Sequence, residues 1–309
     1  MFPGQGSQYI GMGKEFYEQI PICKEVYDLA SEVTGLDIPA LCFEENEKIN
    51  ITEYTQICML ATEAAIYMAL EQNGYQPDVT AGLSLGEYGA LIASGVMTAE
   101  EAFELVRKRG IFMQEAVPAG GAMAAVLGLD AAAIEQICRD TAEQTGSEVS
   151  IANYNCPGQI VISGQEEAVH LAGETCKASG AKRVVPLKVS GPFHSKMLQG
   201  AGEKLKEELK KVEISDSFVP YIANVTADYV TKKEEVKLLL ASQVSSSVRW
   251  QQTIERLLAD GADEFVEIGP GRTLSGFVKK VNRDVKVSSI DKMEDFIQFI
   301  GSHVEAGAC

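Results

Sequence analysis

The stretch from about residue 120 to 189 alternates strand-like and helix-like segments in the order β-α-β-β-α-β. This order is the plan of the ferredoxin-like unit, a compact fold that can be inserted into a larger domain. An Asn155-Cys156-Pro157-Gly158 turn joins the two middle strands. The predicted strands are Ala122 to Leu127, Val149 to Asn153, Gln159 to Ser163 and Arg183 to Val189, and the predicted helices are Ala131 to Gln144 and Glu166 to Ala178.

The segments on both sides of this stretch also alternate helices and strands. Apolar residues recur at helical spacing from Ile57 to Leu70, and glycine and proline then precede a short strand. We therefore predict an α/β protein with a discontinuous catalytic domain, residues 1–118 and 190–309, and a small domain inserted at residues 119–189. The other predicted elements are strands at Val79 to Ala81, Tyr221 to Asn224 and Glu264 to Glu267, and helices at Glu87 to Ala93, Thr98 to Ala116, Ala201 to Lys211 and Trp250 to Asp260.

The charge and the cysteine content argue against several classes of function. A formal net charge of -17 at pH 7 disfavours nucleic acid as a partner, because phosphate binding depends on dense lysine and arginine. The seven cysteines are scattered and lack the spacing of zinc or redox motifs, so we expect no metal site and a reducing setting. No apolar run approaches the roughly 18 residues of a membrane span, and the first residues do not resemble a signal peptide. We expect a cytoplasmic protein without a membrane partner.

A Gly82-Leu83-Ser84-Leu85-Gly86 motif follows the predicted strand that ends at Ala81. In a G-x-S-x-G motif the small residues let the backbone turn sharply from strand to helix, so that the serine hydroxyl projects at the start of the helix. The motif alone is a weak signal, but the strand before it and the helix after it supply the context that it needs. Ser84 is therefore the candidate nucleophile.

A serine nucleophile needs a general base at neutral pH, and the chain has three histidines. His170 lies among glutamates on a predicted helix and His303 lies near the C-terminal end, so we expect surface roles for both. His194 follows Gly191-Pro192-Phe193 at the exit from the small domain, and clefts form at such junctions. His194 is the candidate base, and a hydrogen-bonded loop histidine is the alternative.

The sequence does not supply an obvious acid for a hydrolase-type triad. In α/β-hydrolases the orienting carboxylate falls between the serine and the histidine in chain order. Asp130 and Asp140 are the only aspartates in that interval, and both belong to a predicted helix of the small domain. We therefore expect a dyad of Ser84 and His194 in which a neutral acceptor orients the imidazole.

Arg109 falls at the centre of the apolar arc of the predicted helix from Thr98 to Ala116, whereas Arg107 and Lys108 point away from that arc. A guanidinium on an apolar face is costly unless an anion pairs with it. Two interpretations are open at this point. Arg109 forms a structural salt bridge with an internal carboxylate, or it forms a bidentate clamp for the carboxylate of a substrate.

Six motifs occur in a fixed order along essentially the whole chain. They are Phe2-Pro3-Gly4-Gln5-Gly6-Ser7-Gln8, the Ser84 motif with Glu87-Tyr88, Arg109 before Phe112-Met113-Gln114, Asn153-Tyr154-Asn155-Cys156-Pro157-Gly158-Gln159, Gly191-Pro192-Phe193-His194-Ser195 and Glu267-Ile268-Gly269-Pro270-Gly271. Together they resemble the malonyl-CoA:acyl carrier protein transacylase family of bacterial type II fatty-acid synthesis. The resemblance implies an α/β-hydrolase-like large domain that carries a ferredoxin-like small domain.

The resemblance also implies a reaction and a role for each matching residue. Malonyl-CoA acylates the serine, CoA leaves, and the phosphopantetheine thiol of acyl carrier protein takes the malonyl group. No cofactor is implied beyond the substrate malonyl-CoA, and a monomer is common in the family. The implied site residues are Ser84 as nucleophile, His194 as base, the backbone amides of Gln5 and Leu85 as oxyanion hole, Arg109 as clamp for the malonyl carboxylate, and the backbone carbonyl of Gln243 as the acceptor that orients His194.

The resemblance extends to the acyl pocket and to the docking surface. Phe193 resembles the aromatic residue of malonyl-selective relatives, which leaves little space for an α-methyl branch, and Met113 is a second candidate for the pocket. Carrier protein is acidic in such systems, so a chain with a net charge of -17 needs a basic rim to dock it. The candidates for this rim are Lys182, Arg183, Lys188, Lys279, Lys280 and Arg283, and ordinary solvated charges are the alternative. Lys182, Arg183 and Lys188, together with Asn155, are the candidates for docking CoA or the carrier protein.

The chain departs from the family pattern at two places. Only Met1 precedes the Phe-Pro-Gly-Gln motif, where the family has a hydrophobic strand, and we expect a lost strand to loosen Gln5. Leu83 stands where the family commonly has histidine, and we expect it to change the polarity beside the acyl site without removing the dyad. The alternative functions are a free-standing malonyl acyltransferase of polyketide synthesis and a serine thioesterase or editing hydrolase.

Overall fold

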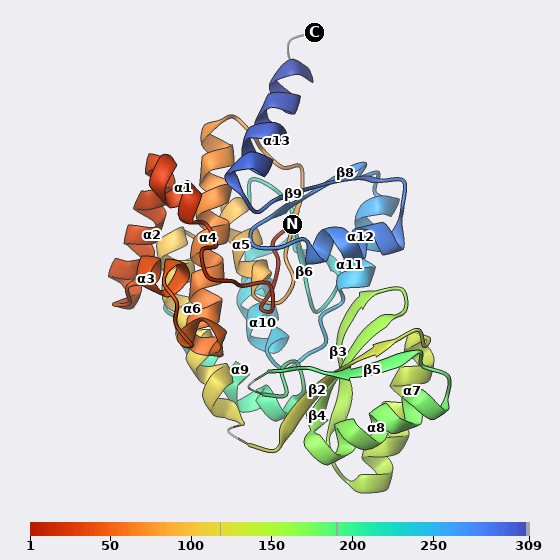
Figure 1. Cartoon of the computed structure of the whole chain (residues 1–309). Helices are drawn as coiled ribbons and strands as arrows, with labels where there is room; N and C mark the ends of the chain where they lie inside the picture. Colours follow the sequence, from red (N-terminus) through yellow and green to blue (C-terminus); the bar gives the residue numbers. More distant parts are fainter. Residues whose placement is uncertain (118, 190, 307–309) are drawn as a thin grey trace.

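The β-α-β-β-α-β stretch forms a four-stranded antiparallel sheet with two helices on one face (Figure 1). The computed structural model describes residues 1–117, 119–189 and 191–306. The elements of this small unit are β2 (Gly121–Leu127), α7 (Ala131–Thr145), β3 (Val149–Cys156), β4 (Gln159–Gln165), α8 (Glu166–Ala178) and β5 (Arg183–Pro186). The order of the strands in the sheet is β3-β4-β2-β5. All six predicted elements are present.

The two faces of this sheet contact different parts of the molecule. Side chains alternate along a strand, so Ala124 and Val126 pack with residues of α7 and α8, whereas Met123 joins the main core of the rest of the chain. At the far edge, the backbone of β3 pairs with Val248, whose amide donates to the Ala152 carbonyl at 2.8 Å. The face opposite the helices is therefore held against the larger part of the molecule.

The last strand of the small unit is shorter than predicted. β5 ends at Pro186, which has no amide hydrogen to donate to the ladder, so the predicted continuation to Val189 is wrong. Lys182 precedes β5 and Lys188 follows it. Of the docking candidates Lys182, Arg183 and Lys188, only Arg183 lies on β5.

Outside the small unit, the described residues form two small sheets. β1 (Thr80–Ala81) runs parallel to β6 (Tyr221–Ala223), and β6 pairs antiparallel with β7 (Asp228–Tyr229). β8 (Glu264–Ile268) and β9 (Lys286–Ile290) form a separate parallel pair. The molecule is thus a mixed α/β structure, as predicted.

Met1 and Phe2 lie between these two sheets. The Phe2 amide donates to the Ala81 carbonyl at 3.0 Å, and the Ile268 amide donates to the Met1 carbonyl at 2.8 Å. The segment that leads to Gln5 is therefore held by backbone hydrogen bonds on both sides. We expected Gln5 to be loosened because only Met1 precedes the Phe-Pro-Gly-Gln motif, and the structure does not bear this out.

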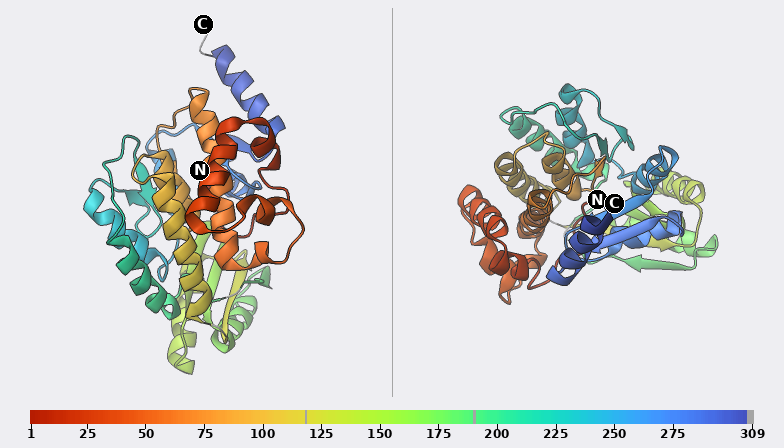
Figure 2. Two further views of the ribbon diagram at one scale, coloured as in Figure 1. Left: turned by 90° about the vertical axis from the view of Figure 1, so that its left-hand side faces the viewer. Right: turned by 90° about the horizontal axis from the view of Figure 1, so that it is seen from above.

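Helices surround the two small sheets (Figures 1 and 2). The small unit lies at the end of the molecule opposite α13. The longest of those described, α4, is buried along most of its length because it is apolar nearly all round. None of the helices in the described ranges is long and apolar enough to cross a lipid bilayer. The remaining elements are α1 (Lys14–Gln19), α2 (Pro21–Thr34), α3 (Ile38–Phe43), η1 (Lys48–Asn50), α4 (Thr52–Gln72), α5 (Gly86–Ala93), α6 (Ala99–Ala116), η2 (Lys196–Leu198), α9 (Gln199–Leu209), α10 (Lys233–Gln243), α11 (Trp250–Ala259), α12 (Thr273–Val281) and α13 (Met293–Ala306).

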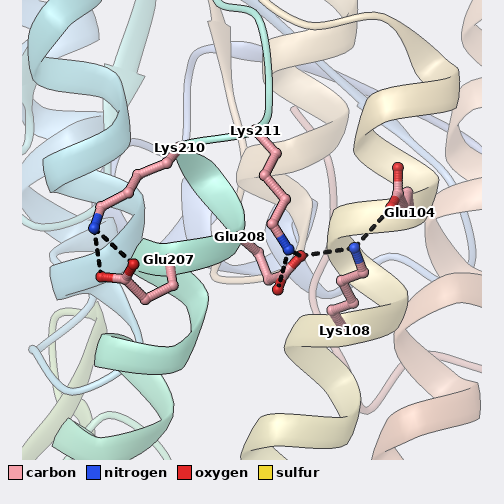
Figure 3. A network of polar contacts seen from close by, with 6 residues as sticks. All are labelled: Glu104, Lys108, Glu207, Glu208, Lys210 and Lys211. Carbon is pink, nitrogen blue, oxygen red and sulfur yellow. Dashed lines mark hydrogen bonds and ion pairs between the residues drawn. The ribbon is translucent and has the colours of Figure 1, made fainter.

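A group of ion pairs on the surface connects α6 to α9 (Figure 3). Lys108 Nζ lies 2.7 Å from Glu104 on its own helix and 2.7 Å from Glu208 on α9. Glu208 also pairs with Lys211 at 2.8 Å. Such partly exposed pairs contribute only up to about 1 kcal/mol each, so they help to align the two helices rather than dominate stability.

Candidate active site

Ser84 lies on a sharp turn between β1 and α5, where its backbone adopts a left-handed φ of 54°. This conformation is strained for a residue with a side chain and persists only where surrounding contacts hold it. The Ser84 amide donates to Asn224 Oδ1 at 2.6 Å, and the Ser84 carbonyl accepts from Gln243 Nε2 at 2.9 Å. Two amide side chains from distant segments thus clamp this residue on both sides.

Gly82 leaves no room for a side chain at this turn. A Cβ atom at this position would overlap the Gly86 carbonyl group. We expect Gly82→Ala to destabilise the protein by about 1–3 kcal/mol, because backbone has to move, and to displace Ser84. Thermal unfolding and acylation rates measure both effects. Gly200→Ala is the matched control, since nothing lies within 4 Å of its added Cβ, and a Gly82→Ala variant as stable and active as that control would contradict the prediction.

His194 is buried, and its Nε2 atom lies 2.8 Å from Ser84 Oγ. Its Nδ1 atom lies 2.9 Å from the backbone carbonyl of Gln243. Because a carbonyl oxygen only accepts hydrogen bonds, Nδ1 carries the proton and Nε2 is free to accept from the serine hydroxyl. The structure therefore brings together the serine, the histidine and a neutral acceptor.

His170 and the two aspartates that we considered from the sequence do not contact Ser84 or His194 in the described structure. The His170 side chain is exposed on α8, 3.9 Å from Glu174. The His303 side chain lies outside the described residues. Asp130 caps the start of α7 and Asp140 accepts from another side chain of the same helix, both at exposed positions. Neither aspartate contributes to the dyad.

Burial, followed by the nearby Arg109 cation, lowers the pKa of His194 to about 4. The imidazole is therefore neutral at physiological pH and able to accept a proton. We expect the acylation rate constant to fall only as the pH approaches about 4, where the protonated ring no longer accepts from Ser84. Rapid-quench acylation across this range, with circular dichroism to check folding at each pH, measures the midpoint. A midpoint near the ordinary value of 6.5 would contradict this prediction.

Arg109 is 1% exposed, and its Nη2 atom lies 3.2 Å from Ser84 Oγ. Its guanidinium otherwise donates to neutral groups, Gln56 Oε1 at 2.6 Å and Gln243 Oε1 at 2.9 Å. Its Nε atom is buried without a hydrogen-bond partner. Within the described part of the chain no carboxylate lies within 4.0 Å of this guanidinium, which contradicts the interpretation of Arg109 as a structural salt bridge.

Three residues that we did not select from the sequence as site residues complete this arrangement: Gln56, Glu87 and Asn224. Glu87 is 1% exposed, and its Oε2 atom accepts from Gln243 Nε2 at 2.7 Å and from the Asn224 amide at 3.1 Å. Burial raises the pKa of Glu87 to about 7, against the lowering effect of these hydrogen bonds and of Arg109. The one sequence signal that could have drawn attention to Glu87 is its charge in the otherwise apolar stretch after Ser84, but that signal does not indicate a role.

A cleft of about 230 Å³ opens beside Ser84, between the small unit and the rest of the molecule. Phe193 and Met113, the predicted acyl-pocket residues, both line it. Gln5 and Leu85 line it as well, and among the described residues their backbone amides have no hydrogen-bond acceptor. Unpaired amides beside a serine are what an oxyanion hole requires. A larger cavity of about 460 Å³, lined in part by residues of β1, contains neither Ser84 nor His194.

Some of the remaining predicted site and docking residues line this cleft, and others do not. Leu83 and Asn155 line it, and the contact between Ser84 and His194 is present with leucine at position 83. The basic docking candidates have exposed side chains that do not line the cleft: Lys182, Arg183, Lys188, Lys279, Lys280 and Arg283. Lys280 donates to Gln159, and Lys279 on α12 donates to the carbonyl groups of Arg283 and Val285, after the helix.

Comparisons with known proteins give a consistent picture. Residues 1–294 match the family model described as the acyl transferase domain. The chain is 50% identical over 296 residues to the malonyl CoA-acyl carrier protein transacylase of Bacillus subtilis (strain 168), which covers 95% of this chain and 93% of that relative. The crystal structure of a malonyl CoA-acyl carrier protein transacylase from Clostridium perfringens has a TM-score of 0.95 and 42% identity, over 99% of this chain and 96% of that one. A malonyl-transacylase solved in complex with its type II PKS acyl-carrier protein has a TM-score of 0.94 and 38% identity, over 97% and 98% of the two chains.

Proposed function

The chain belongs to the acyl transferase family, and on this premise we propose that it transfers a malonyl group from malonyl-CoA to acyl carrier protein in fatty-acid synthesis. The relatives reported above carry this activity in their names, and one of them was solved with its carrier protein. Transfer between two thioesters requires an activated nucleophile, a base and donors for an oxyanion. Groups suited to each of these tasks lie around the cleft.

In the first half-reaction the Ser84 hydroxyl attacks the thioester carbonyl of malonyl-CoA, and His194 Nε2 takes its proton across the 2.8 Å contact. The backbone amides of Gln5 and Leu85 stabilise the oxyanion of the tetrahedral intermediate. The Gln243 carbonyl accepts from Nδ1 and stabilises the imidazolium. The carbon–sulfur bond then breaks, and His194 returns the proton to the departing thiolate of CoA.

In the second half-reaction the phosphopantetheine thiol of the carrier protein enters the same cleft. His194, neutral again, takes the thiol proton while the sulfur attacks the malonyl ester of Ser84. Collapse of this second intermediate breaks the ester bond, and the proton passes from His194 to the Ser84 oxygen. The enzyme is thereby restored, and the balance of atoms requires no cofactor.

The observation that carries the choice of a malonyl group is the buried Arg109 guanidinium beside Ser84. Its Nη2 atom lies 3.2 Å from Ser84 Oγ, so a carboxylate one carbon beyond the reacting carbonyl comes within its reach. A buried cation that has only neutral partners is costly, and a carboxylate on the acyl group relieves that cost with two charge-assisted hydrogen bonds. An acetyl group offers no such contact.

The finer description of the fold is part of the same proposal. The strand order β3-β4-β2-β5, with α7 and α8 on one face, supports a ferredoxin-like domain at residues 119–189. The strand, turn and helix around Ser84 support an α/β-hydrolase-like domain for residues 1–118 and 190–309. We propose a monomer by resemblance to the family, with docking of the carrier protein by Lys182, Arg183 and Lys188.

Intact-mass spectrometry tests the proposed function directly. Incubation with malonyl-CoA should leave a malonyl adduct on the wild-type protein and none on Ser84→Ala, and acetyl-CoA should give little adduct. Holo-carrier protein should then remove the malonyl adduct and gain its mass. Equal yields of acetyl and malonyl adducts would overturn the role of Arg109. Steady hydrolysis without transfer to the carrier thiol would support a hydrolase instead.

A further inference from the structure

Glu87 is a buried carboxyl group that the reaction described above does not use. It lies in the first turn of α5, three residues after the nucleophile, and is 1% exposed. It does not line the cleft. A carboxyl group in such a place is costly unless it is hydrogen bonded or neutral, so its contacts indicate what it does.

Those contacts lead to the backbone of Ser84. One oxygen of Glu87, Oε2, accepts from Gln243 Nε2 at 2.7 Å and from the Asn224 amide at 3.1 Å. Gln243 and Asn224 are the two residues that hold the Ser84 carbonyl and amide, at 2.9 Å and 2.6 Å. Asn224 also donates to the Gly82 carbonyl at 2.6 Å. A single carboxyl oxygen therefore anchors both sides of the clamp that keeps the nucleophile at its left-handed φ.

The same contacts lead to Arg109. The Gln243 amide accepts from Arg109 Nη2 through its oxygen at 2.9 Å and donates to Glu87 through its nitrogen at 2.7 Å. The amide thus bridges a guanidinium and a carboxyl group, and its dipole is aligned with both charges. In the absence of substrate, Glu87 is the counter-charge that this bridge offers to Arg109.

The other titratable groups that act on this site do not compensate Glu87. Tyr88 and Tyr221 are buried phenols whose pKa is raised by burial, so both are neutral at physiological pH. His194, whose pKa burial lowers, is neutral as well. Within the described chain, Arg109 is the one cation whose charge acts on Glu87, and burial raises the pKa of Glu87 to about 7. Glu87 is therefore partly ionised near neutral pH and able to respond to a change in charge.

We propose that Glu87 is a positioning residue for Ser84 and the resident counter-charge of Arg109, and that it takes up a proton when a substrate carboxylate binds to Arg109. This inference rests on the proposed function. Binding puts two carboxyl groups next to one guanidinium in a site with little water, and the group behind the amide bridge becomes neutral. The proton comes from solvent and binds Oε1. Oε2 continues to accept from Gln243 and Asn224, so the clamp on Ser84 is kept.

Titration calorimetry of Ser84→Ala with malonyl-CoA tests the proton uptake, because this variant binds the substrate without being acylated. The heat is measured at pH 7 in buffers of different ionisation enthalpy. We expect uptake of up to about half a proton per site, since a group half ionised before binding becomes neutral. Acetyl-CoA is the control, because it measures the proton uptake or release that binding of the CoA part alone causes. We expect malonyl-CoA to give an uptake in excess of this value.

Ser84→Ala/Glu87→Gln identifies the group that takes the proton. We expect the excess uptake with malonyl-CoA to disappear in this double variant. Uptake that persists would assign the proton to another group, such as His194, and overturn the inference. Malonyl-CoA binding without excess uptake in Ser84→Ala would overturn the inference and leave the proposed function intact. Malonyl-CoA that binds no better than acetyl-CoA would instead overturn the proposed function.

The positioning role has a separate test in variants with an intact Ser84. Glu87→Gln keeps an oxygen for Gln243 and Asn224, so its acylation rate constant should stay within about tenfold of the wild type. Glu87→Ala leaves both donors unpaired and releases the turn, so we expect a loss of about 10²-fold in kcat with a smaller change in KM. Equal losses in the two variants would overturn the positioning role. The calorimetry still decides the proton uptake if Glu87→Ala fails to fold.

Discussion

Replacing His194 with alanine is expected to slow the acylation of Ser84 by about 10²- to 10⁴-fold, the range that loss of a general base produces. His194 Nε2, at 2.8 Å, is the acceptor for the serine proton. The contact that remains to Ser84 Oγ comes from Arg109, a cation that donates hydrogen bonds and has no acceptor. A single-turnover rapid-quench assay with labelled malonyl-CoA measures the acylation step alone.

His170→Ala is the matched control for this substitution. Its side chain is 75% exposed and pairs weakly with Glu174, so its loss should leave acylation unchanged. Thermal unfolding of both variants separates an effect on chemistry from an effect on folding. A loss of less than about tenfold in His194→Ala, with a folded protein, would mean that another group removes the proton.

The small unit was predictable because local patterns determine its elements. Each of its strands and helices follows an apolar repeat within its own segment. Three strand ends were misplaced, because β3 and β4 continue beyond their predicted ends to Cys156 and Gln165, and β5 ends early, at Pro186. Other elements escaped prediction because contacts with residues outside their own segment help to determine them. Helix α12 begins where the amides of Leu274 and Ser275 donate to the buried Glu267 carboxylate of β8, at 2.9 Å and 2.7 Å. No repeat within the helix itself reveals that contact.

The site was predictable where chemistry limits the choices. A serine on a strand-to-helix turn needs a base, and only three histidines were available, so the contact between Ser84 and His194 could be anticipated across 110 residues. Glu87 could not be assigned in this way. Its partners Asn224 and Gln243 are 137 and 156 residues away, and only the fold brings them to its carboxyl group.

Arg109 lies between these two cases. Helical spacing placed its side chain on an apolar face, which the 1% exposure agrees with. The sequence left a structural salt bridge and a substrate clamp equally open, because either supplies the anion that a buried guanidinium needs. The neutral partners Gln56 and Gln243 argue against the salt bridge, and the substrate clamp stays a proposal.

Replacing Arg109 with alanine should therefore change which acyl group the enzyme accepts. Loss of one partner of a buried charge pair costs about 2–5 kcal/mol, which corresponds to a decrease of roughly 30- to 5,000-fold in kcat/KM for malonyl-CoA. Acetyl-CoA makes no contact with the guanidinium, so its kcat/KM should fall far less, and the preference for malonyl-CoA should disappear. Competition between the two thioesters, read by intact mass of the acylated protein, measures the ratio.

Two further variants separate the charge of Arg109 from its shape and its helix. Arg109→Lys keeps a cation but loses the planar fork, so it should retain only part of the malonyl preference. Arg107→Ala is the control for the helix. Arg107 lies on the same helix but pairs with Glu53, which is 2.8 Å away and does not line the cleft, so this variant should keep the full preference for malonyl-CoA. If kcat/KM falls equally for malonyl-CoA and acetyl-CoA in a folded Arg109→Ala variant, Arg109 does not bind the substrate carboxylate. It would then act only by supporting the Ser84 turn through Gln243.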